Sequence, residues 1–229
     1  WRKRTDMGPY IFSCQMMQDP TADATQSFKL EWLRYYDTAP QHGTNNYIVV
    51  DPAHEKKKEN DYTSIWVIGV GEDGMYYCLD IIRDRLNLTE RADLMFQLHK
   101  KWQPLAVGYE KYGMQSDIEH FEDRMNRENY RFVITPLGGQ ISKIDRIRKL
   151  IPLFEQHRIY LPKSLIKSDY QHRTYDAVRV FIDEEYEPFP VGIHPDMLDS
   201  LARIVDPDLS VSQPRTSDLD LDKLYPELY

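Results

Sequence analysis

The chain has 229 residues, of which 41% are hydrophobic and 29% charged, and its formal net charge is −8 at pH 7. This size is typical of one large globular domain with a sizeable core, or of a domain with an arm. The longest apolar runs fall well short of the roughly 20 residues of a membrane span, and the two cysteines are too far apart to suggest a disulfide framework or zinc site. We expect a soluble, intracellular protein that binds nucleic acid, if at all, through a local basic patch or metal ions.

The two ends of the chain differ from its middle in amino-acid composition and in residue pattern. Residues 1–46 are expected to form an arm and linker, although Phe28 to Tyr36 has aromatic residues at helical spacing. Residues 206–229 are rich in Pro, Ser and Asp, which predicts a flexible acidic tail. The domain between them, residues 47–205, is expected to carry the function.

The first half of this domain predicts three antiparallel strands. Tyr47 to Val50 is a buried apolar run, and Tyr62 to Val70 and Met75 to Ile82 are rich in β-branched and aromatic residues. After Asp84 the pattern changes to alternating helices and strands, which implies parallel strands with helical crossovers.

The alternating half is divided by its periodicity and by its Gly and Pro residues. The expected elements are a helix capped by Thr89, a strand from Pro104 to Glu110, a helix from Gln115 to Asn126, a strand from Tyr130 to Thr135, a helix from Ile141 to Gln156, a brief strand from Arg158 to Leu161, and helices from Arg173 to Glu185 and from Pro195 to Ile204. The fold class is therefore α/β, with a mixed five-stranded sheet of three antiparallel and then two parallel strands, flanked by helices. In such a sheet the first and fourth strands are neighbours.

Carboxylates stand at three places that this sheet would bring together. Asp51 ends the first strand, Glu110 ends the fourth, and Asp196 and Asp199 lie one turn apart at the start of the last helix. Clustered carboxylates repel one another unless cations lie between them, and oxygen ligands favour Mg²⁺ or Mn²⁺. Two such ions about 4 Å apart can activate a water and stabilise the leaving oxygen of a phosphodiester, which is nuclease chemistry. Asp51 is the acid that we expect to bridge both ions.

Each acid taken singly also fits an ordinary structural role. Asp51 could accept hydrogen bonds from loop backbone, Glu110 could form a salt bridge at its strand end, and Asp196 could be favoured by the helix dipole.

Two basic segments are candidate contacts for DNA phosphates. One is the loop Lys56-Lys57-Lys58, and the other is the helix face with Lys143, Arg146 and Lys149. Contacts to phosphates carry no sequence preference, and both segments also fit a solvated surface. The chain contains no G-x-x-x-x-G-K-[ST] phosphate loop, so we expect no ATPase site in it.

Taken together, the motifs resemble the nuclease domain of large terminase subunits of tailed bacteriophages. The resemblance extends from Tyr47 to Ile204 and rests on D-P-A from Asp51, D-Y-T from Asp61, Y-E at Tyr109-Glu110 and H-P-D-M-L-D-S-L-A from His194. It implies a ribonuclease H-like fold and a metal-dependent endonuclease with two Mg²⁺ or Mn²⁺ ions, which cuts concatemeric double-stranded DNA with little sequence specificity during packaging.

The resemblance also implies roles for individual residues. Asp51, Glu110 and Asp196 would bind the metals and act in catalysis, with Asp199 in support. The family pattern is H-D-D-x-x-D-A, whereas here Pro replaces the first Asp and Ser the Ala, so the choice between Asp196 and Asp199 as main third ligand stays open. Asp61 and His194 are possible supporting residues, although each also fits a capping role.

Partners and location follow from the same resemblance. It implies double-stranded DNA, the portal protein, the small terminase subunit and the protein's own ATPase domain as partners, no membrane, and a place in the host cytoplasm and transiently at the procapsid portal. The segment from Gly8 to Gln15 is similar to the end of a terminase ATPase domain, so we expect a fragment that lacks the motor's nucleotide site. Two other interpretations remain open: a junction resolvase or transposase-type nuclease of the same fold, and a catalytically silent domain that docks DNA or a portal.

Overall fold

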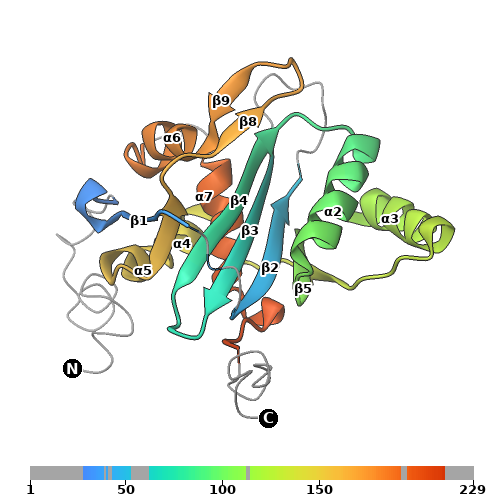
Figure 1. The fold of residues 1–229 in the computed structure, drawn as a ribbon, viewed down its shortest axis with the longest axis horizontal. Helices are drawn as coiled ribbons and strands as arrows, with labels where there is room; N and C mark the ends of the chain where they lie inside the picture. The colour runs from blue at the N-terminus through green and yellow to red at the C-terminus, as the bar shows by residue number, and fades with distance from the viewer. Residues whose placement is uncertain are drawn as a thin grey trace, which may run out of the picture.

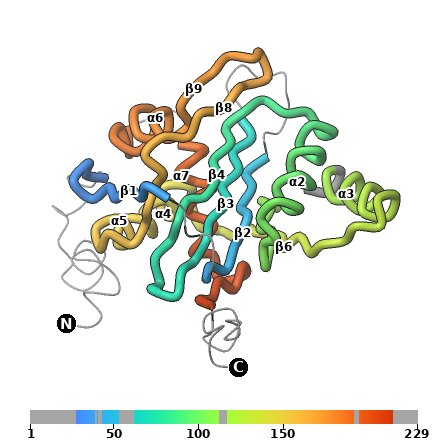
Figure 2. The backbone as a smooth tube through the Cα atoms, viewed as in Figure 1, coloured from blue at the N-terminus to red at the C-terminus, as the bar shows by residue number. Residues whose placement is uncertain are grey.

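The structure is a computed structural model, and it describes residues 28–38, 40, 43–52, 62–111, 114–191 and 195–214. Within these ranges a seven-stranded mixed sheet lies at the centre, with helices on both faces (Figures 1 and 2). Several predicted features lie outside the described residues, namely Lys56, Lys57, Lys58, Asp61, His194, the arm before Phe28 and the tail from 215 onward.

The predicted five-stranded arrangement is present in the middle and at one edge of the sheet. Its strands are β2 (Thr44–Asp51), β3 (Thr63–Gly71), β4 (Tyr76–Asp84), β5 (Ala106–Glu110) and β6 (Ile134–Leu137). The first three are antiparallel, whereas β5 pairs in parallel with β2, and β6 with β5. The first and fourth predicted strands are therefore neighbours, as expected.

The predicted five-stranded sheet nevertheless lacks two of the observed strands, one of which overlaps the brief strand that was expected from Arg158 to Leu161. β1 (Arg34–Tyr36) and β7 (Ile159–Pro162) extend the sheet beyond β4, giving the order β1-β7-β4-β3-β2-β5-β6. Both pairings are parallel and join segments far apart in sequence, so local patterns could not reveal them. A separate two-stranded sheet, β8 (Ile166–Ser168) and β9 (Thr174–Asp176), lies to one side.

Helices form a layer on each face of the sheet. They are α2 (Leu88–Trp102), α3 (Met114–Glu128), α4 (Lys143–Arg148), α5 (Ile151–Glu155), α6 (Ala177–Phe181) and α7 (Asp196–Ala202). α2 and α3 cover one face, and α4 to α7 cover the other (Figure 1). Short 3-10 turns follow α7 at Arg203–Val205 and Pro207–Leu209, and a π-helical turn, Ile182–Tyr186, continues α6. None of the described helices has both the length and the apolar character of a membrane span.

β2 is buried on both faces, and its side chains alternate between two cores. Tyr47 and Val49 belong to the core beneath α4 to α7, whereas Ile48 and Val50 belong to the core beneath α2 and α3. Because successive side chains of a strand point to opposite faces, Asp51 falls on the side of α7.

Two predicted helices of the second half were wrong in extent. The predicted helix from Ile141 to Gln156 is divided into α4 and α5, because Pro152 has no N–H for the hydrogen bond that a continuous helix would require. Ile141, the first residue of that predicted helix, precedes α4 and is 48% exposed. The predicted helix from Arg173 begins instead as β9 and becomes helical at Ala177, after Asp176 has capped it.

The predicted cap of α2, Thr89, lies two residues after the observed one. Its cap is Asn87, whose side chain accepts a hydrogen bond from the Glu90 backbone, while the Glu90 carboxylate accepts one from the Asn87 backbone. This reciprocal capping box satisfies two backbone donors at once.

The segment from Phe28 to Tyr36, whose aromatic residues have helical spacing, contains a single 3-10 turn, Leu30–Trp32, followed by β1. Phe28 is buried against Phe154 and Tyr186, so the described part of the expected arm contributes to the core. At the other end Leu209 is 3% exposed, so the chain still packs on the sheet beyond residue 206.

Candidate metal centre

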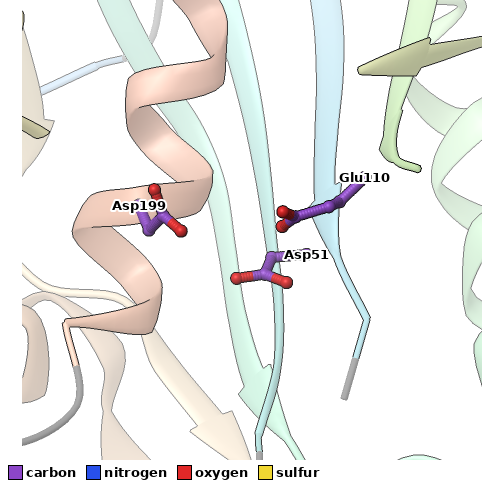
Figure 3. A group of neighbouring side chains, drawn as sticks. All are labelled: Asp51, Glu110 and Asp199. Carbon is purple, nitrogen blue, oxygen red and sulfur yellow. The ribbon is translucent and has the colours of Figure 1, made fainter. Parts of the chain in front are cut away.

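Three carboxylates from two strand ends and one helix meet at an edge of the sheet (Figure 3). Asp51 ends β2, Glu110 ends β5 and Asp199 lies on α7. Parallel pairing of β2 with β5 places the two strand ends side by side. One oxygen from each carboxylate lies within 4.8 Å of the others, so the group can converge on a single ion.

The electrostatics of this group favour a bound cation. Burial raises the pKa of Asp51 well above its ordinary value, and the neighbouring charge of Glu110, a hydrogen bond with it and the charge of Asp199 raise it further. In the protein alone, a proton on Asp51 therefore relieves the repulsion. Three carboxylates without a sulfur or nitrogen ligand form a hard donor set, and the residues present fit a divalent cation such as Mg²⁺ or Mn²⁺.

Two arginines hold the carboxylates in place. The Arg146 guanidinium donates to both oxygens of Asp199, at 2.6 and 2.7 Å, and an Arg203 nitrogen donates to Glu110 at 2.7 Å. A two-point contact between guanidinium and carboxylate fixes orientation as well as charge. Rotation of Asp199 about its side-chain bonds is therefore restrained before any ion binds.

Asp196 lies outside the three-carboxylate group. It is the first residue of α7, and Lys143 donates to it at 2.6 Å while standing 3.9 Å from Asp199. The first hydrogen bond of the helix runs from the Asp199 backbone to the Pro195 carbonyl, so Asp199 completes the turn that faces the strand ends. The structure thus brings Asp199, rather than the favoured Asp196, to Asp51 and Glu110.

Of the three basic residues predicted to contact DNA from α4 and its C-terminal end, two contact the acids and one lines a cavity. Lys143 and Arg146 are turned toward the acids instead of forming a solvated face. Burial lowers the pKa of Lys143, but the charges of Asp196 and Asp199 outweigh this effect and raise it above its ordinary value. Lys149 follows α4 and lines a cavity beside the carboxylates.

Sequence reasoning missed three residues that support the site. Arg203 was not singled out, although it follows Asp199 by four residues and therefore shares its helix face. Ser64, the register partner of Asp51, lies with its hydroxyl oxygen 2.6 Å from that of Ser200, which ties β3 to α7. Glu185 accepts a hydrogen bond from the first turn of α7, and no sequence pattern indicated that contact.

Comparison with known proteins places the fold. The family model described as "Terminase RNaseH-like domain" matches residues 48–205, which is more than half of the chain. The human cytomegalovirus terminase nuclease domain, in an Mn-soaked structure, is 11% identical with a TM-score of 0.52, over 78% of this chain and 95% of that one. The large terminase nuclease of thermophilic phage G20c with bound magnesium is 12% identical with a TM-score of 0.46, over 76% and 92%.

The Thermus phage P74-26 large terminase nuclease domain is 13% identical with a TM-score of 0.46, over 76% of this chain and 90% of that one. No protein with a curated function matches the chain. The cytomegalovirus structure is similar at the level of the fold, and together with the family match it confirms the predicted ribonuclease H-like fold. The chain belongs to the family of terminase RNase H-like domains.

Proposed function

We propose that this chain is the nuclease domain of a DNA-packaging terminase. It would be a divalent-metal-dependent endodeoxyribonuclease that cuts concatemeric double-stranded DNA with little sequence specificity. The observation that carries this proposal is the convergence of Asp51, Glu110 and Asp199 at one edge of the sheet. The Mn-soaked nuclease domain of cytomegalovirus terminase, which has a similar fold, supports it.

The proposed metal ligands are Asp51, Glu110 and Asp199, with Asp51 shared by two Mg²⁺ or Mn²⁺ ions. Two ions bound there would supply an activated water and stabilise the leaving oxygen of the phosphodiester. The chain's own contribution is to hold three carboxylate oxygens at a common point. Arg146 orients Asp199 for this task, and Arg203 orients Glu110.

Asp196 has a supporting role in this proposal. Its carboxylate holds Lys143, which stands beside Asp199. In this way Asp196 affects the charge balance of the site without supplying one of the three converging oxygens. His194 and Asp61 stay candidates for similar support.

DNA would be held through its phosphates, by Lys149 and by the loop Lys56-Lys57-Lys58. Lys143 and Arg146 would contribute positive charge from within the site. Contacts of this kind neutralise phosphates irrespective of sequence, which agrees with cutting of little specificity.

The wider assembly is part of the same proposal. We propose the portal protein, the small terminase subunit and an ATPase domain as partners, with action in the host cytoplasm and at the procapsid portal. Residues 47–205 would form the nuclease domain, residues before them would lead from the ATPase domain, and residues after 206 would form a tail. Phe28 and Leu209 would then be the points at which both flanking segments attach to the nuclease core.

Cleavage of supercoiled plasmid tests the proposal. Wild-type protein should nick and then linearise plasmid at scattered sites with Mg²⁺ or Mn²⁺, and EDTA should stop the reaction. Asp51→Asn should abolish cleavage while the protein stays folded, and Asp123→Asn, an exposed acid on the far helix α3, should cut like wild type. Inactivity of well-folded wild type with either ion would refute a nuclease, and a preference for four-way junctions would favour a resolvase.

A further inference from the structure

A cavity of about 210 Å³ lies beside the three carboxylates. The segment Gly138-Gly139 after β6 forms part of its wall. Arg146 lines it from α4, Lys149 from the residue after that helix, and Arg203 from the turn after α7. Since a water molecule takes about 30 Å³ in the liquid, the cavity has room for a phosphate group together with several waters. Arg146 and Arg203 line this cavity and also contact the carboxylates Asp199 and Glu110, so the two sites adjoin.

Arg203 is a buried cation in the wall of the cavity. Its side chain is only 3% exposed, and its two terminal nitrogens contact Glu110 at 2.7 Å and Asp206 at 3.4 Å. Its guanidinium is therefore held in place by two carboxylates, and it contributes positive charge to the cavity without moving.

Lys149 adds a positively charged side chain to the cavity. Its ammonium makes no ion pair within the part of the chain that the structure describes, unlike those of Lys143 and Lys167. Gly139, which also lines the cavity, has a φ of 147°, which side-chain-bearing residues rarely adopt, and a Cβ added to it would meet nothing within 4 Å. The cavity wall is therefore bare backbone at this point, which allows close approach of a ligand.

Two carboxylates, Asp206 and Asp208, also line the cavity. Asp206 is bound by Arg203, and it accepts a hydrogen bond from the backbone of Asp208. Because Arg146 and Arg203 are already paired with Asp199 and Glu110, Lys149 is the lining cation whose charge is available to a ligand. In the metal-loaded site, Arg146 and Arg203 would neutralise less of the carboxylate charge, and the cavity would become more positive.

We propose that this cavity is a subsite for a backbone phosphate of DNA, adjacent to the phosphodiester that lies at the carboxylates. Lys149 would bind the phosphate oxygens, the guanidinium groups of Arg146 and Arg203 would add positive charge to the cavity wall, and the Gly138-Gly139 segment would let the DNA backbone approach. This inference rests on the proposed function and adds a place for the phosphate next to the one that is cleaved.

Lys149 is the residue to change, because Arg146 and Arg203 also hold the metal ligands. Binding of a fluorescent 20-base-pair duplex would be measured in EDTA, where the DNA stays intact, over a range of salt concentrations. Lys149→Ala should weaken binding several-fold at low salt and reduce the slope of log K against log salt by about 1. Lys149→Arg should restore both. Arg127→Ala, which removes a charge from the opposite face of the sheet, is the matched control and should change neither.

Plasmid cutting and amide spectra distinguish failure of the phosphate subsite from failure of the proposed nuclease function. If wild type binds and cuts DNA but Lys149→Ala keeps its affinity and salt slope with an unchanged melting temperature, the subsite is refuted and the nuclease stands. If wild type neither binds nor cuts, the proposed function fails as well. Amide spectra of ¹⁵N-labelled protein should show Gly139 shifting with the duplex. A shift with inorganic phosphate and none with the duplex would assign the cavity to a free anion and overturn the proposal.

Discussion

Glu185 is the buried acid whose replacement should change the pH dependence of stability. Its side chain is 1% exposed, one oxygen accepts a hydrogen bond from the Leu198 backbone at 2.9 Å, and the other is buried without a hydrogen-bond partner among the described residues. Burial raises its pKa from 4.5 to about 7, although the Leu198 backbone and Arg83 pull it down. Because Leu198 precedes Asp199, this contact also supports the metal centre.

The sign and size of the effect follow from this pKa. The folded protein holds the Glu185 proton more tightly than the unfolded chain, so the stabilisation is complete below pH 4.5 and is lost as pH rises through about 7. Each pKa unit is worth about 1.4 kcal/mol, so a rise of about 2.5 corresponds to roughly 3 kcal/mol. Glu185→Gln keeps an acceptor for Leu198 and never ionises. We expect it to raise the free energy of unfolding at pH 8 by about 1–3 kcal/mol, with little change at pH 5.

Urea unfolding at pH 5, 6, 7 and 8 measures this effect. The control is Glu184→Gln, because Glu184 is the neighbouring acid and is 54% exposed. It should leave the shape of the pH profile unchanged. The argument would be refuted by a Glu185→Gln profile that runs parallel to that of wild type, since the ionisation of this carboxyl would then not be linked to folding.

Three further predictions concern the site and its support. Asp199→Ala should abolish plasmid nicking, whereas Asp196→Ala should leave a reduced but measurable rate, because only Asp199 lies with the other two carboxylates; the opposite ranking would give the third ligand position to Asp196. The hydroxyls of Ser64 and Ser200 are hydrogen-bonded to each other in the core, so a double-mutant cycle with Ser64→Ala and Ser200→Ala should yield a coupling free energy of about 1 kcal/mol, measured by urea unfolding. Strictly additive effects of the two substitutions on the free energy of unfolding would contradict this prediction. Asn87→Ala should lower the free energy of unfolding by about 1 kcal/mol through loss of the capping box, and unchanged stability would show that another group caps α2.

Much of the sheet could be predicted because strands are read from local pattern and connected by few topologies. The apolar run before Asp51 and the alternation after Asp84 were enough to place β2 beside β5. Adjacent parallel strand ends then bring Asp51 and Glu110 together, and this proximity does not depend on how the other elements pack. The brief strand expected from Arg158 to Leu161 is present as β7, but its place in the sheet could not be predicted in this way, because it depends on long-range parallel partners. β1 was not predicted at all, because it is short and pairs only with β7.

The sequence by itself determined that two acids end neighbouring strands and that two more lie one turn apart on the last helix. It left open which of those two faces the strands, because helical spacing defines a face but not the direction in which it points. That direction follows from packing: Met197 and Leu198 are buried in the core, and the Trp66 side chain donates to the Met197 carbonyl. Together with the contacts of Arg146 to Asp199 and of Glu185 to Leu198, this packing turns Asp199 toward Asp51. Asp196 cannot take its place, because one helical turn, about 5.4 Å, is more than a side chain can compensate within a metal site.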